Sequence, residues 1–223
     1  MASKGNLTIT KMCKAAKEFC AQESGVWQKE LFGVTDGKAI GTFVEHRFQD
    51  YLAKNYDIVS GNSANGLDLP STNTDIKVTS IVQPQSSCPY KDSRQKVYGL
   101  GYNLIIFVYH KEDDTAKKRG TLHYVSCTYV SAERTADYQL TRGINEILNN
   151  NGNKDDIFAF LSDRRVPGDE TTLSLLAEEI ISNPPMIGYL TISNALQWRL
   201  QYNRIVHLNE SVKGITTIVK YES

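Results

Sequence analysis

The pattern of hydrophobic and polar positions predicts helices at both ends of the chain and strands in its middle. Apolar residues recur at helical spacing over 7–20, and again from a cap at Asp36 to Leu52. A nearly continuous apolar run over 102–109 is typical of a central strand buried on both faces, and the charged segment 111–120 is expected to be a loop. Further helices are expected at 89–100, 136–148, 155–161, 171–181 and 193–206, and further strands around Leu67 and at 75–79, 121–130 and 215–221.

The order of these elements predicts an α/β (α+β) fold in which a central mixed β-sheet is flanked by helices. The 223 residues suffice for one sizeable core, so we expect a single domain over 1–223. Lysine and arginine together number 25, as do aspartate and glutamate, so any surface for nucleic acid must be local. Without a signal peptide or a long apolar run, the protein is expected to be cytoplasmic, with no membrane partner.

The segment 66–80 concentrates the candidate chemistry. Asp68 is followed by a short polar turn and then by Asp75 and Lys77, which lie two residues apart in an apolar strand. Side chains alternate along a strand, so Asp75 and Lys77 share one face while Ile76 and Val78 enter the core. A hairpin turn over 70–73 would bring Asp68 beside them. Two carboxylates and an ammonium group in one cleft indicate phosphodiester hydrolysis with a divalent metal ion.

In this interpretation the two aspartates bind Mg²⁺, and the backbone carbonyl of Ile76 and several waters complete the octahedron. Lys77 would orient or deprotonate the attacking water, or stabilise the charge that develops on phosphate. Among carboxylates a lysine tends to stay charged, which favours orientation and charge stabilisation. Glu45, at the edge of the apolar stripe of the second helix, is the expected third acid and a further metal ligand.

Glu45, Asp68 and the triplet Asp75-Ile76-Lys77 together resemble the PD-(D/E)xK nuclease superfamily, although Leu67 stands where that motif has proline. The size of the chain is most similar to that of type II restriction endonucleases. The resemblance covers a restriction-endonuclease-like core at about 36–130. The remainder of the chain does not match it, and about 131–223 is expected to be a helical or recognition region. The resemblance also implies Mg²⁺-dependent cleavage of double-stranded DNA by a homodimer, with 5′-phosphate and 3′-hydroxyl ends and a cognate DNA methyltransferase in the host.

Polar side chains that follow the predicted catalytic strand are candidate DNA contacts, because amide and hydroxyl groups can bind phosphates and base edges. These candidates are Gln83, Gln85, Ser86, Ser87, Lys91 and Arg94. The alternative interpretation is a polar connection followed by a solvated helix face, which is favoured for Lys96. For the pair Arg164-Arg165 the alternatives are DNA contact and a solvated charge cluster. The cluster at 198–204 could form a recognition or dimerisation helix, although core packing explains Trp198 and Tyr202 more simply.

Other functions remain open at this point. The chain could be a repair or recombination nuclease of the same fold, or a catalytically silent DNA-binding module. The motif could also be structural, with Asp68 as a turn residue, Asp75 and Lys77 as a solvent-facing pair, and Glu45 as an ordinary helix charge.

Overall fold

The structure is a computed structural model that describes residues 4–58, 66–89, 91–193 and 198–222. The chain divides into two compact units. Unit 1 comprises residues 1–85, 103–130 and 206–223, and unit 2 comprises residues 86–102 and 131–205. The two segments of unit 2 therefore interrupt the sequence of unit 1 at two places. The expected division had a single boundary, near residue 130. No helix in the described residues is long and apolar enough to cross a membrane.

Unit 1 is built on a four-stranded mixed sheet with the order β3-β5-β6-β9. Its strands are β3 (Thr74–Ser80), β5 (Asn103–Asp114), β6 (Arg119–Val130) and β9 (Ile215–Val219). β3 is an edge strand that pairs in parallel with β5, whereas β5 pairs with β6 and β6 with β9 in antiparallel fashion. The expected mixed sheet with flanking helices is confirmed, and residues 104–109 of β5 are all buried, as expected.

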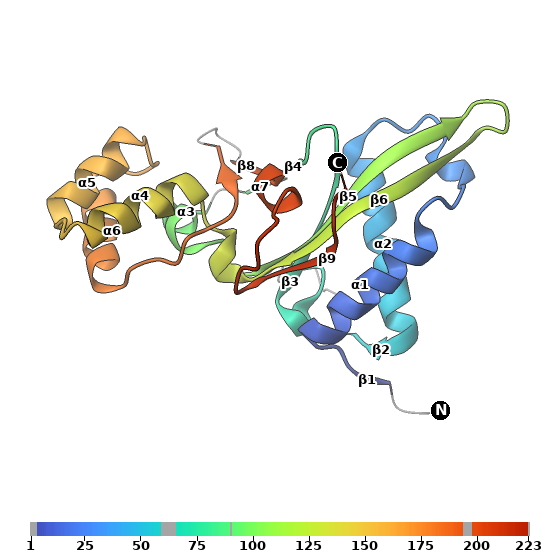
Figure 1. Cartoon of the computed structure of the whole chain (residues 1–223), viewed down its shortest axis with the longest axis horizontal. Helices are drawn as coiled ribbons and strands as arrows, with labels where there is room; N and C mark the ends of the chain where they lie inside the picture. The colour runs from blue at the N-terminus through green and yellow to red at the C-terminus, as the bar shows by residue number, and fades with distance from the viewer. Residues whose placement is uncertain (1–3, 59–65, 90, 194–197, 223) are drawn as a thin grey trace. The chain divides into compact units, whose positions relative to one another are not determined.

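The helices α1 (Ile9–Glu23) and α2 (Gly37–Asn55) pack beside this sheet (Figure 1). α2 begins where expected, because the Asp36 carboxylate accepts hydrogen bonds from the backbone N–H groups of Lys38 and Ala39. Phe19, Phe48 and Phe107 interlock edge to face, with ring centroids 5.0–5.8 Å apart. This aromatic cluster fixes α2 over the strands that carry the candidate site. A short parallel pair, β1 (Gly5–Asn6) and β2 (Tyr56–Asp57), completes unit 1.

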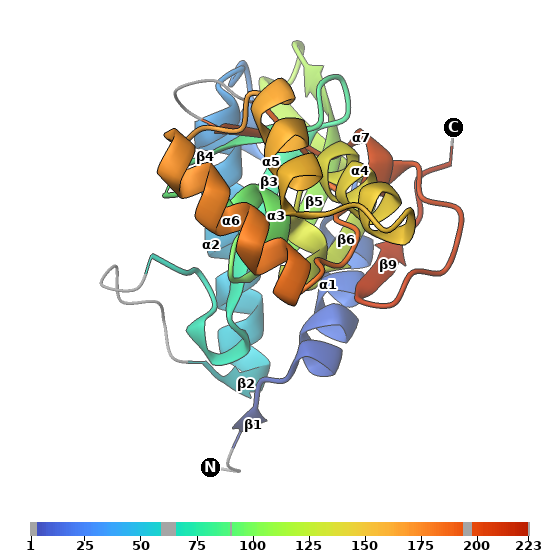
Figure 2. The ribbon, with the colours of Figure 1, turned by 90° about the vertical axis from the view of Figure 1, so that its left-hand side faces the viewer.

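Unit 2 is mainly helical (Figure 2). Its helices are α3 (Arg94–Tyr98), α4 (Tyr138–Asn149), α5 (Lys154–Asp163), α6 (Glu170–Ser182) and the start of α7 (Asn203–Val206). A small sheet has the order β4-β8-β7, formed by β4 (Gln85–Cys88), β8 (Trp198–Gln201) and β7 (Thr191–Ile192). The buried Asp137 carboxylate caps α4 at Leu140 and also accepts from the Ile192 N–H, which ties helix and sheet together.

Two sequence expectations about element type are wrong. The segment 111–120 is no loop, because β5 and β6 continue as a long hairpin in which ion pairs Lys111–Asp113 and Arg119–Asp114 stabilise the charged end. The helix expected over 193–206 contains a strand instead: buried Trp198 and Leu200 alternate with exposed Arg199 and Gln201, a period of two. Residues 194–197 of that expected helix lie outside the described residues.

The hairpin expected before β3 is only partly formed. Leu67 belongs to no strand, and a single antiparallel bridge joins Leu69 to Thr74 around the 3-10 turn Pro70–Thr72. Asn73 closes this turn in the left-handed region with φ of 49°, which asparagine tolerates better than most residues. The chain therefore reverses tightly, and Asp68 reaches β3 from a bend instead of a paired strand.

Candidate active site

Asp75 and Lys77 form an ion pair on the edge strand β3. Lys77 Nζ lies 2.6 Å from Asp75 Oδ2, and the two side chains expose 20% and 10% of their surface, respectively. Ile76, between them, points to the other face and packs in the core of unit 1 with Val78 at its margin. The predicted alternation along the strand is confirmed, and the solvent-facing pair of the structural alternative is not observed.

Asp68 is held against the outer edge of β3 by a backbone hydrogen bond. Its Oδ2 accepts from the Ile76 N–H at 2.7 Å, so the carboxylate satisfies a donor that β5 does not use. The N–H and C=O of one residue in a strand point to the same edge, so the Ile76 carbonyl faces the Asp68 side as well. One edge of the sheet thus presents a carboxylate and a backbone carbonyl next to the Asp75–Lys77 pair.

The electrostatics of the site centre on Asp75. Burial, together with a hydrogen-bonding contact with the Asp68 carboxyl, raises the pKa of the Asp75 carboxyl group to about 7, although the Lys77 ammonium opposes both effects. Near neutral pH the Asp75 carboxyl group therefore carries a proton for part of the time. A divalent cation would take the place of that proton.

Glu45 lies half-buried on α2, one helical turn before Gln49. The Gln49 amide donates to the backbone carbonyl of Asp68 at 3.4 Å, so this face of α2 borders the site. Gln49 is a supporting residue that sequence reasoning missed. Its i+4 spacing from Glu45 is the signal that could have identified it. The role of Glu45 as a third acid stays a prediction.

The donor set suits Mg²⁺. Across the described ranges, no three His, Cys, Asp or Glu side chains are grouped closely enough to hold a metal ion by themselves. Mg²⁺ does not require such a cage, since it is usually bound by one or two carboxylates, several waters and substrate phosphate oxygens. Asp68 and Asp75, in mutual contact at the edge of the sheet, meet that description.

The first two expected DNA contacts lie on the turn that leaves β3. The Thr79 hydroxyl accepts from the Gln85 N–H at 3.0 Å and lies 3.2 Å from the Gln83 carbonyl and 3.0 Å from the Gln85 carbonyl. These bonds use the backbone of the turn. The Gln83 side chain is exposed and that of Gln85 is half-exposed, so the turn presents both amides to its surroundings.

The remaining expected contacts lie in unit 2. Ser86 Oγ and the Tyr202 hydroxyl lie 2.5 Å apart, whereas Ser87 and Lys91 are exposed. Arg94 is exposed as well, but its guanidinium already binds the Glu179 carboxylate through two nitrogens. A DNA phosphate would therefore compete with Glu179 for Arg94, and the role of each of these residues in DNA binding stays a prediction.

The solvated position expected for Lys96 is wrong. Its side chain is buried, with Nζ 5.9 Å from the centroid of the Trp198 ring. Burial lowers the pKa of Lys96, and the Asp137 carboxylate opposes this shift. Lys96 therefore belongs to the interior of unit 2.

Comparison with known proteins finds one family model and one curated relative that match most of the chain. A family model described as "Type II restriction enzyme NspV" matches residues 6–217. The type II restriction enzyme NspV of Nostoc sp. (strain ATCC 29411 / PCC 7524) is 54% identical over 214 residues, which cover 96% of this chain and 97% of the relative. No solved structure matches the chain.

Proposed function

Because the chain belongs to the type II restriction enzyme NspV family, we propose that it cleaves double-stranded DNA at a specific short sequence with Mg²⁺ as cofactor. The observation that carries this proposal is the cluster on β3, where the Asp75–Lys77 ion pair meets the Asp68 carboxylate. Its order along the chain and its place on a sheet edge support assignment to the PD-(D/E)xK superfamily.

Each residue of the cluster has a distinct role in this proposal. Asp68 and Asp75 hold Mg²⁺ together with the Ile76 carbonyl, and Glu45 is an additional ligand. The bound ion supplies Lewis acidity toward the scissile phosphate and lowers the pKa of water. Lys77 keeps its positive charge beside Asp75, where it orients the attacking water and stabilises negative charge on the phosphate oxygens.

Water attack at phosphorus with departure of the 3′ oxygen leaves a 5′-phosphate and a 3′-hydroxyl. We propose these ends, a homodimer that cuts both strands, and a host DNA methyltransferase that protects the same sequence. The exposed amides of Gln83 and Gln85, with Ser86, Ser87, Lys91 and Arg94, are the proposed DNA contacts.

Digestion of a sequenced plasmid tests the proposal directly. With MgCl₂ we expect a small number of discrete fragments whose ends ligate, and with EDTA we expect none. A smear, or nicking that depends on DNA structure, would instead indicate a repair or recombination nuclease. DNA binding without any cutting in Mg²⁺ would indicate a catalytically silent module and would contradict the proposal.

Mg²⁺ affinity is expected to depend on pH. Because the cation must displace the proton that Asp75 holds up to about pH 7, the affinity should fall about tenfold for each pH unit below that value. The MgCl₂ concentration that gives half of the maximal rise in Tm measures this dependence in DNA-free protein. A half-maximal concentration that is unchanged between pH 6 and pH 8 would show that Asp75 does not hold the ion.

A further inference from the structure

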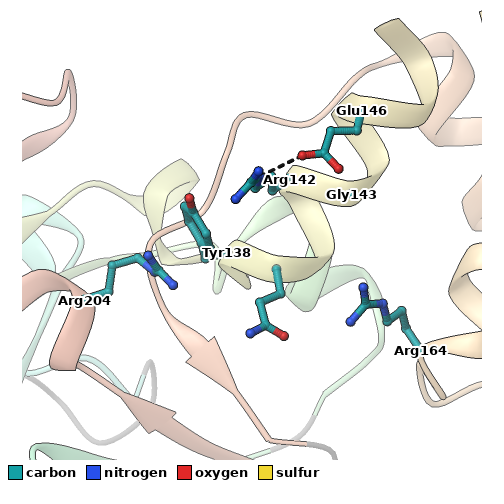
Figure 3. Close-up of a pocket in the computed structure, with 7 residues that line it drawn as sticks. Tyr138, Arg142, Gly143, Glu146, Arg164 and Arg204 are labelled. Atoms are coloured by element: carbon teal, nitrogen blue, oxygen red, sulfur yellow. Dashed lines mark hydrogen bonds and ion pairs between the residues drawn. The ribbon is translucent and has the colours of Figure 1, made fainter. Parts of the chain in front are cut away.

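Unit 2 contains a cleft of about 460 Å³ whose lining is dominated by arginine (Figure 3). Its principal side chains come from one face of α4, from the end of α5 and from α7. They are Tyr138, Arg142, Glu146, Arg164 and Arg204, with Gly143 between them. Three guanidinium groups against one carboxylate make this cleft cationic, whereas the positive and negative charges of the whole chain balance.

Arg204 is positioned by an aromatic ring. Its guanidinium carbon lies 3.5 Å from the centroid of the Tyr138 ring, and Figure 3 shows the side chain directed toward that ring. In the part of the chain that the structure describes, no carboxylate pairs with Arg204. A guanidinium stacked on a ring keeps its N–H groups available in the plane, which suits it for binding an anion.

The opposite wall depends on close packing between α4 and α5. A Cβ atom at Gly143 would lie 2.3 Å from the Phe160 ring, so glycine allows this ring to rest directly on α4. Arg164 in turn lies over Phe160, 5.1 Å from the ring centroid. Both Arg164 and Arg204 are therefore held over aromatic rings on either side of the same helix face.

The carboxylate of the cleft is already engaged. Glu146 Oε1 accepts from Arg142 Nε at 2.8 Å, one turn apart on α4. This pair neutralises itself, and Arg164 and Arg204 are the other two cationic side chains that line the cleft. Planar guanidinium groups match the oxygen geometry of both phosphate and carboxylate and repel a metal ion, so the cleft suits an anion that offers two or more oxygens.

From this arrangement we propose that the arginine cleft binds a backbone phosphate of double-stranded DNA, independently of base sequence. The proposal rests on the proposed function, because a DNA substrate supplies the phosphate that such a site would bind. It assigns Arg204, with Arg142 and Arg164, to DNA positioning rather than to base reading.

DNA binding measured in EDTA, without cleavage, tests the cleft. Arg204→Ala is expected to weaken binding roughly tenfold, and to reduce the slope of log affinity against log salt by about one. The loss should be equal for a cognate and a scrambled duplex. Arg204→Lys, which keeps the charge, should restore most of the slope. Glu146→Gln should tighten binding about two- to fivefold, because it removes the negative charge of the cleft.

Lys154→Ala is the matched control, since it removes a cation of unit 2 that pairs with Glu178 and does not line the cleft. Wild-type affinity and slope in Arg204→Ala, or an equal loss in Lys154→Ala, would overturn the proposal. A loss of affinity confined to the cognate duplex would also overturn it. So would binding of inorganic phosphate that Arg204→Ala abolishes while DNA binding stays intact. Failure of the wild-type protein to bind or cut any DNA would instead refute the proposed function.

Discussion

Asp75→Asn is expected to reduce the rate of DNA cleavage by at least about a thousandfold, while the protein remains folded. Asparagine keeps the size of the side chain but cannot carry the charge that holds a divalent cation beside Asp68. The measurement is single-turnover cleavage of a duplex that contains the recognition sequence, with circular dichroism as the check on folding.

The same change should stabilise the metal-free protein at alkaline pH. The pKa of Asp75 is raised to about 7 in the folded chain, against about 3.9 when unfolded. The protonated Asp75 carboxyl therefore contributes its full stabilisation below the unfolded-state pKa, and this contribution is lost as the pH rises through the folded-state pKa. Asparagine mimics the protonated acid, so Asp75→Asn should raise Tm at pH 8 and leave it nearly unchanged at pH 4.

Asp113→Asn provides the matched control for both measurements. Asp113 also pairs with a lysine two residues away on a strand of unit 1, but it lies on the β5–β6 hairpin. The Asp113→Asn substitution should leave the cleavage rate unchanged and should not raise Tm at pH 8. Cleavage by Asp75→Asn at the wild-type rate would show that Asp75 is not required for catalysis.

The central part of the site could be predicted because it depends on local geometry. Alternation along a strand places Asp75 and Lys77 on one face whatever the rest of the chain does, and the ion pair observed between them follows. The approach of Asp68 was predicted for the wrong reason. Its position comes from a bend and a hydrogen bond to the Ile76 N–H rather than from a second strand.

Features that depend on distant contacts could not be predicted. Lys96 resembles a solvated helix residue by its local spacing, yet Trp198, about a hundred positions later, covers it. Arg142, Arg164 and Arg204 likewise come from three helical segments, and no spacing in the sequence brings them together. The two-unit organisation has the same origin, because the chain leaves unit 1 after β3 and returns to it for β5.

Errors in element type had a different cause. The strand β8 shows period-two burial over four residues, but the apolar positions of the longer window also suit a helix. The hairpin end at 111–120 is charged, which favours a loop by composition, although paired charges on an exposed hairpin are compatible with strand structure. The periodicity of apolar positions therefore does not identify strands that are short or highly charged.

Lys77→Met is expected to lower the single-turnover cleavage rate by about 10²- to 10⁴-fold without weakening DNA binding in EDTA. Methionine has a similar length but no charge, so water orientation and charge stabilisation are lost while packing is retained. Lys77 also lowers the pKa of Asp75, so its removal should raise that pKa above its value of about 7. The pH at which Mg²⁺ begins to raise Tm should then move upward.

This second readout separates a catalytic role for Lys77 from a purely structural one. Lys111→Met breaks the lysine–aspartate pair on the hairpin, and it should change neither the cleavage rate nor the pH dependence of Mg²⁺ binding. A lysine that only stabilised the edge of the sheet would, when replaced, lower Tm at every pH and leave the onset of Mg²⁺ binding in place. That result, or cleavage at the wild-type rate, would contradict the assignment of Lys77, because its charge would then be unnecessary both for the attacking water and for Asp75.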